Sequence, residues 1–550
     1  MNKSTLAFSG GEKAKKTILL HSSFGLWPIL EYELDIAQRE LDSGNKVIFL
    51  YCDGAQIGCP VNSPRADINF KNKYCNECKS RVKKGIDWLR AGPGELIVEP
   101  YDASYENKIE EDIKVKLQRI ETVYPDQEKI KDIVDTGGVD IFESALSTVM
   151  SKLLDPSPQL ERNWLLIKAY IENALRAHLS ALYHLNKWSP DVCYIYNGRI
   201  SRYRPMLRLI QDRDIKILVY EYPETDGNSN YENFDLVENN YSHDLLNYSK
   251  QLYKLFIDDE SDYQDKLLKG KSWFLERFYG KSHGFQTLMT EMQEKDSLPI
   301  EWNEEDFNIS FFISSEHEWA GIPEVTGITP YKNQNDCIIA LAKTLPERAK
   351  LYIRMHPDLK NDKKQLMNIE HLNVVLINPL DTIDTYKLAE ASDLVICFAS
   401  TVGVESAFMK KPVIVIGASI YNEFNVASMI YQHNDLINVV ESAINGDYSA
   451  FPNEQQRYEG ACAFAYSFIN FPTKTKYLEK NTDLGGYMVR DGIKTRISAN
   501  IYIKIYNRLL DFPAKIFEVF RIVTNDSNKW KQFKQAPLKS VKRKFFGELP

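Results

Sequence analysis

Short apolar runs alternate with stretches of helical spacing over much of the chain. The apolar run from Thr17 to His21 is followed by leucine and alanine residues at helical spacing over 30–41, and then by the run from Lys46 to Tyr51. Gly44 separates the helical stretch from the second run, as expected at a helix C-terminus. A strand, a helix and another strand in this order favour a parallel sheet with a right-handed crossover. We therefore predict a Rossmann-like α/β unit at the start of the chain.

The same alternation returns in the second half of the chain. Four apolar runs that fit buried parallel strands cover residues 309–313, 351–354, 394–397 and 413–416. A helical pattern over 334–345 lies between the first two runs. The predicted fold is therefore α/β, with two Rossmann-like domains that face each other across a cleft.

These patterns divide the chain into four predicted segments. They are an N-terminal Rossmann-like domain (1–240), a helical connector (241–304), a second Rossmann-like domain (305–450) and a helical C-terminal segment (451–550). In the last segment, helical structure is expected over 453–525, where Ile501, Ile505 and Leu509 share one face.

The totals for the chain limit its class. With 550 residues, of which 43% are apolar and 26% charged, the chain is long enough for two domains and has the composition of a soluble globular protein. No window is apolar enough to span a membrane, and residues 1–16 lack the apolar core of a signal peptide. A cytoplasmic protein is therefore expected. The net charge of -8 argues against a dedicated nucleic-acid-binding protein.

The end of the chain departs from this acidic average. Residues 529–550 contain seven Lys or Arg residues, one Glu and four aromatic residues. Basic and aromatic side chains together suit a segment that lies on an anionic membrane surface, and a solvated basic tail is the alternative. The first interpretation predicts peripheral association with the inner face of the cell membrane.

Two polar motifs follow predicted strands in the second domain. Arg354-Met355-His356-Pro357 ends the run that begins at Leu351, and Ser400-Thr401-Val402-Gly403-Val404-Glu405 follows the run over 394–397. Ligands of open parallel sheets bind outside the carboxyl ends of the strands. Small hydroxyl residues and a glycine at the start of a helix also present free backbone N–H groups, which suit a phosphate. The pattern therefore predicts a site for a nucleotide-linked donor.

Each motif residue has a chemical reason to take part in such a site. Arg354 offers fixed hydrogen-bond donors to a phosphate, and His356 can donate to a phosphate oxygen as the sugar leaves. Glu405 is placed to accept hydrogen bonds from a ribose. The alternatives are a structural turn at the Arg-x-His-Pro motif and a first-turn carboxylate favoured by the helix dipole. The predicted donor-binding residues are Ser314, Ser315, Arg354, His356, Pro357, Ser400, Thr401, Gly403 and Glu405.

The two motifs carry a resemblance to a known family, together with Tyr386–Asp393 and Lys411-Pro412-Val413-Ile414. The sequence resembles bacterial capsule and lipopolysaccharide glycosyltransferases of GT-B type, above all the capsule polysaccharide biosynthesis group, which includes Kdo transferases that use CMP-Kdo. The His-Pro and Ser-Thr motifs are also similar to those of GT-B sialyltransferases, where they bind the CMP part of the donor. The resemblance implies a CMP-, UDP- or GDP-linked sugar donor, a glycan or glycolipid acceptor and no cofactor for transfer, because protein donors replace a cation.

The catalytic base is expected in the N-terminal domain, close to the acceptor hydroxyl. Asp53 directly follows the second predicted strand, and the Asp53-Gly54 pair loosely resembles an acidic-Gly motif that carries the base in GT-B sialyltransferases. His21 and Glu221 end other strands and are rival candidates. The residues expected to line the acceptor cleft are His21, Gly25, Asn197, Arg199 and Glu221.

Four of the eight cysteines lie in one window over 52–78. They are Cys52, Cys59, Cys75 and Cys78, with the spacing C-x6-C-x15-C-x2-C. Two cysteine pairs in a cytoplasmic chain suit a structural tetrahedral Zn site that fixes a loop beside the cleft. Reduced thiols packed in a core are the alternative.

The sequence thus predicts a glycosyltransferase that moves a sugar to a bacterial surface polysaccharide or its lipid-linked precursor. A polyol-phosphate transferase of the teichoic-acid type shares the Arg-x-His-Pro motif, but its second motif usually reads Asp-Tyr-Ser-Ser, where this chain has Phe398-Ala399-Ser400-Thr401. A sugar-nucleotide 2-epimerase on the same fold is a second alternative. An inactive GT-B assembly subunit is the alternative that is not an enzyme.

Overall fold

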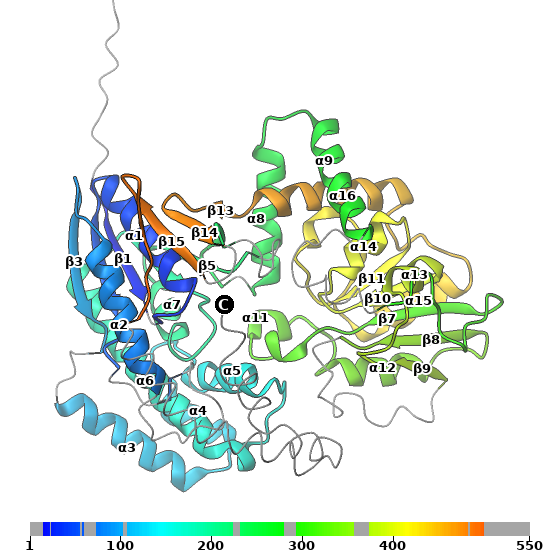
Figure 1. Ribbon diagram of the computed structural model, residues 1–550. Helices are drawn as coiled ribbons and strands as arrows, with labels where there is room; N and C mark the ends of the chain where they lie inside the picture. Colours follow the sequence, from blue (N-terminus) through cyan, green and yellow to red (C-terminus); the bar gives the residue numbers. More distant parts are fainter. Residues whose placement is uncertain are drawn as a thin grey trace, which may run out of the picture.

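The computed structural model describes residues 15–22, 24–54, 58–59, 73–102, 107–223, 231–241, 243–279, 293–356, 373–481 and 485–499. Two α/β units, each built on a largely parallel sheet, make up most of this part of the chain (Figure 1). The predicted fold class, two Rossmann-like units in the GT-B arrangement, is confirmed by these two sheets. The described residues contain no helix that is both long and apolar enough to cross a membrane. The tail over 529–550 lies outside the described residues.

The first unit is built on a seven-stranded sheet in the order β13-β6-β5-β4-β1-β2-β3. Its strands are β1 (Thr17–Ser22), β2 (Lys46–Tyr51), β3 (Glu95–Pro100), β4 (Val192–Tyr196), β5 (Lys216–Glu221), β6 (Asn233–Glu238) and β13 (Thr473–Lys474). β1 to β5 run parallel, whereas β6 and β13 are antiparallel to their neighbours. Because β1 pairs with both β2 and β4, the strand order reverses there, and the carboxyl ends of β1 and β4 flank a switch point where ligands bind in such sheets.

The second unit has a six-stranded sheet in the order β12-β11-β10-β7-β8-β9. Its strands are β7 (Phe307–Phe312), β8 (Ala349–Arg354), β9 (Val374–Ile377), β10 (Leu394–Cys397), β11 (Val413–Ile416) and β12 (Ser428–Ile430), and all of them are parallel. The order reverses between β7 and β10. The segments that follow β7 and β10 therefore start on either side of this second switch point.

Helices cover both sheets and add a separate helical core to the first unit. The helices of the first unit are α1 (Ile29–Asp42), α2 (Lys73–Trp88), α3 (Asn107–Val123), α4 (Gln127–Val134), α5 (Ile141–Leu153), α6 (Leu160–Trp188) and α7 (Arg204–Gln211). Those that follow β7 to β12 are α11 (Pro323–Thr326), α12 (Gln334–Ala342), α13 (Thr385–Ala391), α14 (Val402–Phe408) and α15 (His433–Ile444). α3 to α6 share an apolar cluster of their own, which includes Trp164 and Phe142.

The chain passes between the units twice. α8 (Leu245–Asp258) and α9 (Tyr263–Phe278) lead to the second unit, and α16 (Glu454–Asn470) packs against both of them and against α14 (Figure 1). After α16 the chain returns to the first unit, where β13 joins the seven-stranded sheet.

The predicted helical structure over 453–525 is wrong between 473 and 495, where the chain forms strands. Residues 478–495 form a three-stranded antiparallel sheet of β14 (Leu478–Asn481), β15 (Gly485–Arg490) and β16 (Ile493–Thr495). The turn between β15 and β16 is Asp491-Gly492, and both residues have positive φ, 52° and 76°. Asp-Gly is a strong hairpin signal because this turn needs two residues that tolerate positive φ. Residues 500–525 lie outside the described part of the chain.

Candidate functional site

A serine and a histidine meet at the carboxyl ends of two neighbouring strands of the second sheet. β7 and β8 are paired so that Phe312 lies beside Arg354, and Ser315 and His356 follow these strands. Ser315 Oγ lies 3.0 Å from His356 Nδ1, a hydrogen bond whose direction depends on the histidine tautomer. If the Ser315 hydroxyl donates, His356 Nε2 carries the proton and can donate it to a ligand. The two predicted donor-binding residues are thus brought together, while Pro357 lies outside the described residues.

Glu316 is a titratable group beside this pair that sequence reasoning did not single out. Its side chain is buried, and one carboxylate oxygen accepts a hydrogen bond of 3.0 Å from the backbone N–H of Gln334. Burial raises the pKa of Glu316 to about 7. A buried carboxyl with this pKa can exchange a proton near neutral pH. Its position directly after Ser315 was readable from the sequence, but its burial was not.

Arg354 does not offer its guanidinium freely at this edge. The residue is 5% exposed, and its two terminal nitrogens donate to the backbone carbonyls of Asn378 (3.0 Å) and Asp381 (3.3 Å). These bonds fix the loop that follows β9. Arg354 therefore supports this loop, and its predicted contact with a donor phosphate stays a prediction.

Ser314 supports the segment that follows β7. Its backbone N–H donates to Gln334 Oε1 (2.8 Å), its carbonyl accepts from Gln334 Nε2 (3.0 Å), and its hydroxyl accepts from Trp319 Nε1 (3.2 Å). The Trp319 ring is in turn parallel to that of Phe398, which follows β10. Ser314 therefore has a structural role that the sequence did not predict, since Gln334 is distant in the chain.

The Ser400–Gly403 loop after β10 is tightly packed. Ala399 has φ of +48°, and the hydroxyl of Tyr421 donates to the Ser400 carbonyl at 2.7 Å. The Ser400 hydroxyl accepts from the backbone N–H of Val402 (3.3 Å), and Thr401 precedes α14. A Cβ on Gly403 would lie 2.2 Å from the Tyr421 oxygen, so only glycine fits there. The phosphate-binding role of Ser400, Thr401 and Gly403 stays a prediction.

Glu405 has a partner other than a ribose. It is 1% exposed and forms an ion pair with Arg277 of α9, which is also buried and lies over the Trp273 ring. The pair ties α14 to the connecting helices. This ion pair compensates the burial of the carboxylate, which is costly without a charged partner. The predicted ribose contact of Glu405 stays a prediction.

Three of the predicted acceptor-side residues come together at the carboxyl ends of β4 and β5. Asn197 Nδ2 donates to Glu221 Oε2 at 2.6 Å, and Arg199 donates its backbone N–H to Asn197 Oδ1 at 3.2 Å. Burial raises the pKa of Glu221 above its ordinary value. The Arg199 guanidinium donates to the backbone carbonyl of Glu318 in the second unit. This cluster therefore touches the segment that carries Ser315.

His21 and Gly25 both pack closely within the first unit, and their predicted place at the acceptor cleft stays a prediction. His21 is fully buried and stacked on Tyr101 with ring centroids 3.9 Å apart, and burial and the nearby Arg202 lower its pKa. Gly25 packs against α2, where an added Cβ would lie 2.3 Å from the Cys78 carbonyl oxygen. The glycine is thus explained by close packing.

The cysteine window surrounds the loop that carries Asp53. Cys78 Sγ accepts a hydrogen bond of 2.8 Å from the Gly25 N–H, and a Cβ on Gly54 would lie 2.7 Å from Cys75 Sγ. Burial raises the pKa of the Cys52 thiol to about 12 and that of Cys78 to about 11, so both are protonated near neutral pH when no metal is bound. Among the described residues, no group of three or more Cys, His, Asp or Glu side chains is arranged to hold a metal ion. Structural zinc and the base role of Asp53 stay predictions.

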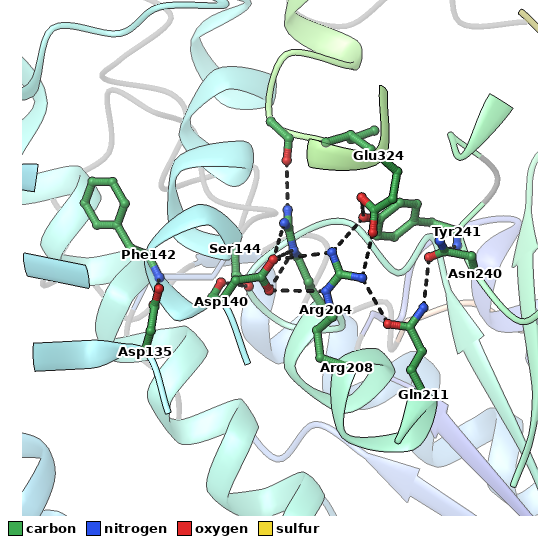
Figure 2. A network of polar contacts seen from close by, with 12 residues as sticks. Asp135, Asp140, Phe142, Ser144, Arg204, Arg208, Gln211, Asn240, Tyr241 and Glu324 are labelled. Atoms are coloured by element: carbon green, nitrogen blue, oxygen red, sulfur yellow. Dashed lines mark hydrogen bonds and ion pairs between the residues drawn. The ribbon is translucent and has the colours of Figure 1, made fainter. Parts of the chain in front are cut away.

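A charged network also joins the two units (Figure 2). Arg208 of α7 forms ion pairs with Glu324 of α11 (2.8 Å) and with Asp140 (3.3 Å). Arg204, fully buried, binds Asp140 and donates to the backbone carbonyl of Gly321 at 2.8 Å. The segment that follows Ser315 is thus held on α7 of the first unit. Two arginines four positions apart on a helix can be read from a sequence. That Arg208 pairs with Glu324, 116 residues further along the chain, cannot.

The comparison with protein families adds an independent finding. Residues 330–433 match the model of the family described as "Capsule polysaccharide biosynthesis protein". This stretch is similar to capsule polysaccharide biosynthesis proteins. The matched stretch contains β8, β10 and β11, and with them His356 and the Ser400 loop. A search of curated proteins found no match.

Solved structures similar to this chain include two of Thermosulfurimonas dismutans KpsC. The β-Kdo 2,4 transferase is 13% identical, with 58% of this chain and 86% of that chain covered at a TM-score of 0.35. The β-Kdo 2,7 transferase is 14% identical, with coverage of 61% and 89% and a TM-score of 0.34. The UDP-GlcNAc 2-epimerase of Neisseria meningitidis, solved with UDP-GlcNAc, is 13% identical, with coverage of 82% and 98% and a TM-score of 0.28. Because TM-scores below 0.5 do not establish a common fold, the fold assignment rests on the strand order of this chain.

Proposed function

We propose that this protein is a glycosyltransferase, which moves a sugar from a nucleotide-activated donor to a bacterial surface polysaccharide or its lipid-linked precursor. The observation that carries the proposal is the contact between Ser315 and His356 at the carboxyl ends of β7 and β8. This contact lies at the switch-point edge of a parallel sheet, where nucleotides bind in such folds. The family match over 330–433 includes His356 and supports a role in capsule polysaccharide synthesis.

In this proposal, the second unit holds the donor. His356, oriented by Ser315, donates a hydrogen bond to a phosphate oxygen of a CMP-, UDP- or GDP-linked sugar, which stabilises the negative charge that grows as the sugar leaves. The backbone of the Ser400–Gly403 loop, on the other side of the switch point, binds the same phosphate. The proton on Nε2 is available to the leaving group only if Nδ1 accepts the Ser315 hydroxyl.

The first unit supplies the acceptor side. Asn197, Arg199 and Glu221 stand at the carboxyl ends of β4 and β5, and Arg199 contacts the segment that follows Ser315. Glu221 is a base candidate because burial raises the pKa of its carboxyl group, and Asp53, at the end of β2, is the second candidate. The attacking acceptor hydroxyl would lose its proton to one of these groups.

The proposal is tested by nucleotide release. The purified protein is incubated with a panel of CMP-, UDP- and GDP-linked sugars and with a lipid extract of bacterial cell envelopes, and free nucleotide is measured. Release from one class of donor, dependent on the extract and lost in His356→Ala, is the expected result. Equal release by wild type and His356→Ala, or no release from any donor, contradicts the proposal.

A further inference from the structure

A group of aromatic side chains gathers at the start of α1 and the carboxyl end of β5, apart from the Ser315–His356 pair. We call Trp27, Tyr32, Tyr222 and Tyr231 the aromatic group. The rings of Trp27 and Tyr231 meet edge to face with centroids 5.5 Å apart, and those of Tyr32 and Tyr222 are 6.4 Å apart. Trp27, Tyr222 and Tyr231 are only half-buried, so part of each ring reaches solvent.

Two buried carboxylates adjoin these rings. Glu221 accepts a hydrogen bond from the backbone N–H of Tyr222 at 3.2 Å, and both Glu221 and Glu31 lie close enough to act electrostatically on the Tyr222 hydroxyl. Glu31 is 1% exposed, and one of its oxygens pairs with Arg81 of α2. Half-exposed aromatic faces beside carboxylates form a surface with both apolar and hydrogen-bonding character.

Two buried polar atoms, one in the aromatic group and one on Glu31 beside it, lack the hydrogen-bond partners that buried polar atoms normally have. The Tyr32 hydroxyl and the second carboxylate oxygen of Glu31, both fully or almost fully buried, have no hydrogen-bond partner among the residues that the structure describes. Tyr222, Tyr231, Asp235 and Glu221 all lie close enough to the Tyr32 hydroxyl to act on it electrostatically. Buried polar atoms are nearly always satisfied, and an exception calls for a ligand or water.

The aromatic group is connected to the donor side through a short chain of contacts. Tyr222 adjoins Glu221, Glu221 binds Asn197, and Arg199 reaches the Glu318 carbonyl in the segment that starts at Ser315. A molecule that occupies the aromatic group therefore lies on the first unit, next to the place where that unit meets the donor side.

We propose that the aromatic group and the carboxylates of Glu31 and Glu221 bind a sugar ring of the acceptor saccharide. The apolar C–H face of the ring would lie on Tyr222 and Tyr231, and its hydroxyls would donate to Glu31 and Glu221 and accept from Tyr32. This inference rests on the proposed glycosyltransferase function and adds to it the residues that would hold the acceptor, because sugar hydroxyls can donate to carboxyl oxygens and accept from a phenol hydroxyl.

A competing explanation is packing alone. Trp27 lies against β15, where a Cβ on Gly486 would come within 2.4 Å of the indole ring, so Trp27 also helps to hold the C-terminal strands. Tyr222 and Tyr231 are therefore the residues to change, because they are half-buried. Tyr183, which is 44% exposed on α6, provides a matched control.

The experiment is a binding screen of the full-length protein on an array of bacterial saccharides. We expect wild type to bind a defined set of saccharides, Tyr222→Ala and Tyr231→Ala to lose at least about tenfold in affinity, and Tyr183→Ala to bind as wild type does. Tyr222→Phe keeps the ring and should retain most of the affinity. No saccharide binding by wild type, or equal binding by all variants, overturns the inference.

The same preparations separate this inference from the proposed function. Folding of each variant is checked by circular dichroism, and nucleotide binding by thermal shift with CMP, UDP and GDP. If a nucleotide stabilises every variant while saccharide binding is absent or unchanged, the acceptor inference alone fails. If no nucleotide binds wild type, the proposed function fails. If Tyr222→Ala does not fold, Glu221→Gln must weaken saccharide binding for the inference to stand.

Discussion

Ser315 Oγ and His356 Nδ1 lie 3.0 Å apart, although 41 positions separate the two residues in the chain. The parallel pairing of β7 with β8 brings them together, because it places the residues that follow Phe312 beside those that follow Arg354. A hydrogen bond from a hydroxyl to Nδ1 fixes the orientation of the imidazole and selects the tautomer in which Nε2 carries the proton. The contact thus gives His356 a defined direction toward the edge of the sheet where a nucleotide is expected.

This contact predicts a graded loss of transfer in two variants. His356→Ala removes the group that stabilises the leaving phosphate and should lower the transfer rate by about 100-fold or more. Ser315→Ala leaves the imidazole in place but without its partner, and a loss of about tenfold is expected from one hydrogen bond. Steady-state rates with the preferred donor measure both effects, with melting temperatures as the check on folding. If both variants lower the melting temperature and leave the transfer rate unchanged, the Arg-x-His-Pro motif is a structural turn and not a donor site.

A second prediction concerns Glu405 and Arg277, both buried and paired with each other. Glu405→Gln leaves the Arg277 charge without a carboxylate and should lower the free energy of unfolding by about 3–5 kcal/mol. Urea denaturation measures this loss. Glu390→Gln, which removes an exposed pair with Lys387, is the matched control and should cost less than about 1 kcal/mol. A stable Glu405→Gln protein with weakened nucleotide binding would support the predicted contact between Glu405 and the ribose of the donor.

The raised pKa of Glu33 predicts how the stability of the folded protein depends on pH. This residue of α1 is buried, hydrogen-bonded by Ser22 and Tyr220, and its pKa is raised from 4.5 to about 8 by burial. Between these two values the folded protein holds a proton that the unfolded chain has lost, so stability falls as pH rises through this range, by about 1.4 kcal/mol per pH unit. Glu33→Gln should flatten the slope in unfolding experiments between pH 5 and pH 8. An unchanged slope would contradict the buried neutral carboxyl.

Metal content tests the cysteine window. If Cys52, Cys59, Cys75 and Cys78 hold structural zinc, the purified protein carries about one Zn per chain and Cys75→Ser lowers this value. Side-chain rearrangement on metal binding is required, because the described residues contain no preformed group of ligands. Elemental analysis, with thiol titration before and after a chelator, measures both quantities. Four titratable thiols and no zinc would favour packed, reduced cysteines.

The alternation of apolar runs and helical spacing was sufficient to predict both Rossmann-like units. Runs such as Lys46–Tyr51 and Leu394–Cys397 are buried on both faces, and this burial leaves a clear signal in the sequence. The antiparallel strands over 478–495 differ from the predicted helix, because the apolar spacing near residue 500 favours a helix whereas Asp491-Gly492 favours a hairpin. A local turn signal decided the structure there.

The candidate site was predictable where it depends on strand ends and not where it depends on distant partners. Ser315 and His356, like Asn197 and Glu221, lie at the carboxyl ends of adjacent parallel strands, so their proximity follows from the strand order. The partners of Arg354 and Glu405 are a loop carbonyl and an arginine on another helix. Tertiary packing determines those partners, so they cannot be predicted from the spacing of residues along the chain.

The central claim, a nucleotide donor site at the second sheet, is tested most directly by thermal shift of the purified protein with CMP, UDP, GDP, ADP and TDP. A ligand that binds only the folded state raises the melting temperature, by an amount set by its affinity and concentration. We predict that CMP, UDP or GDP stabilises the wild type and that His356→Ala loses most of this shift, while the basal melting temperature stays nearly unchanged. No shift with any nucleotide would contradict the account and favour an inactive assembly subunit.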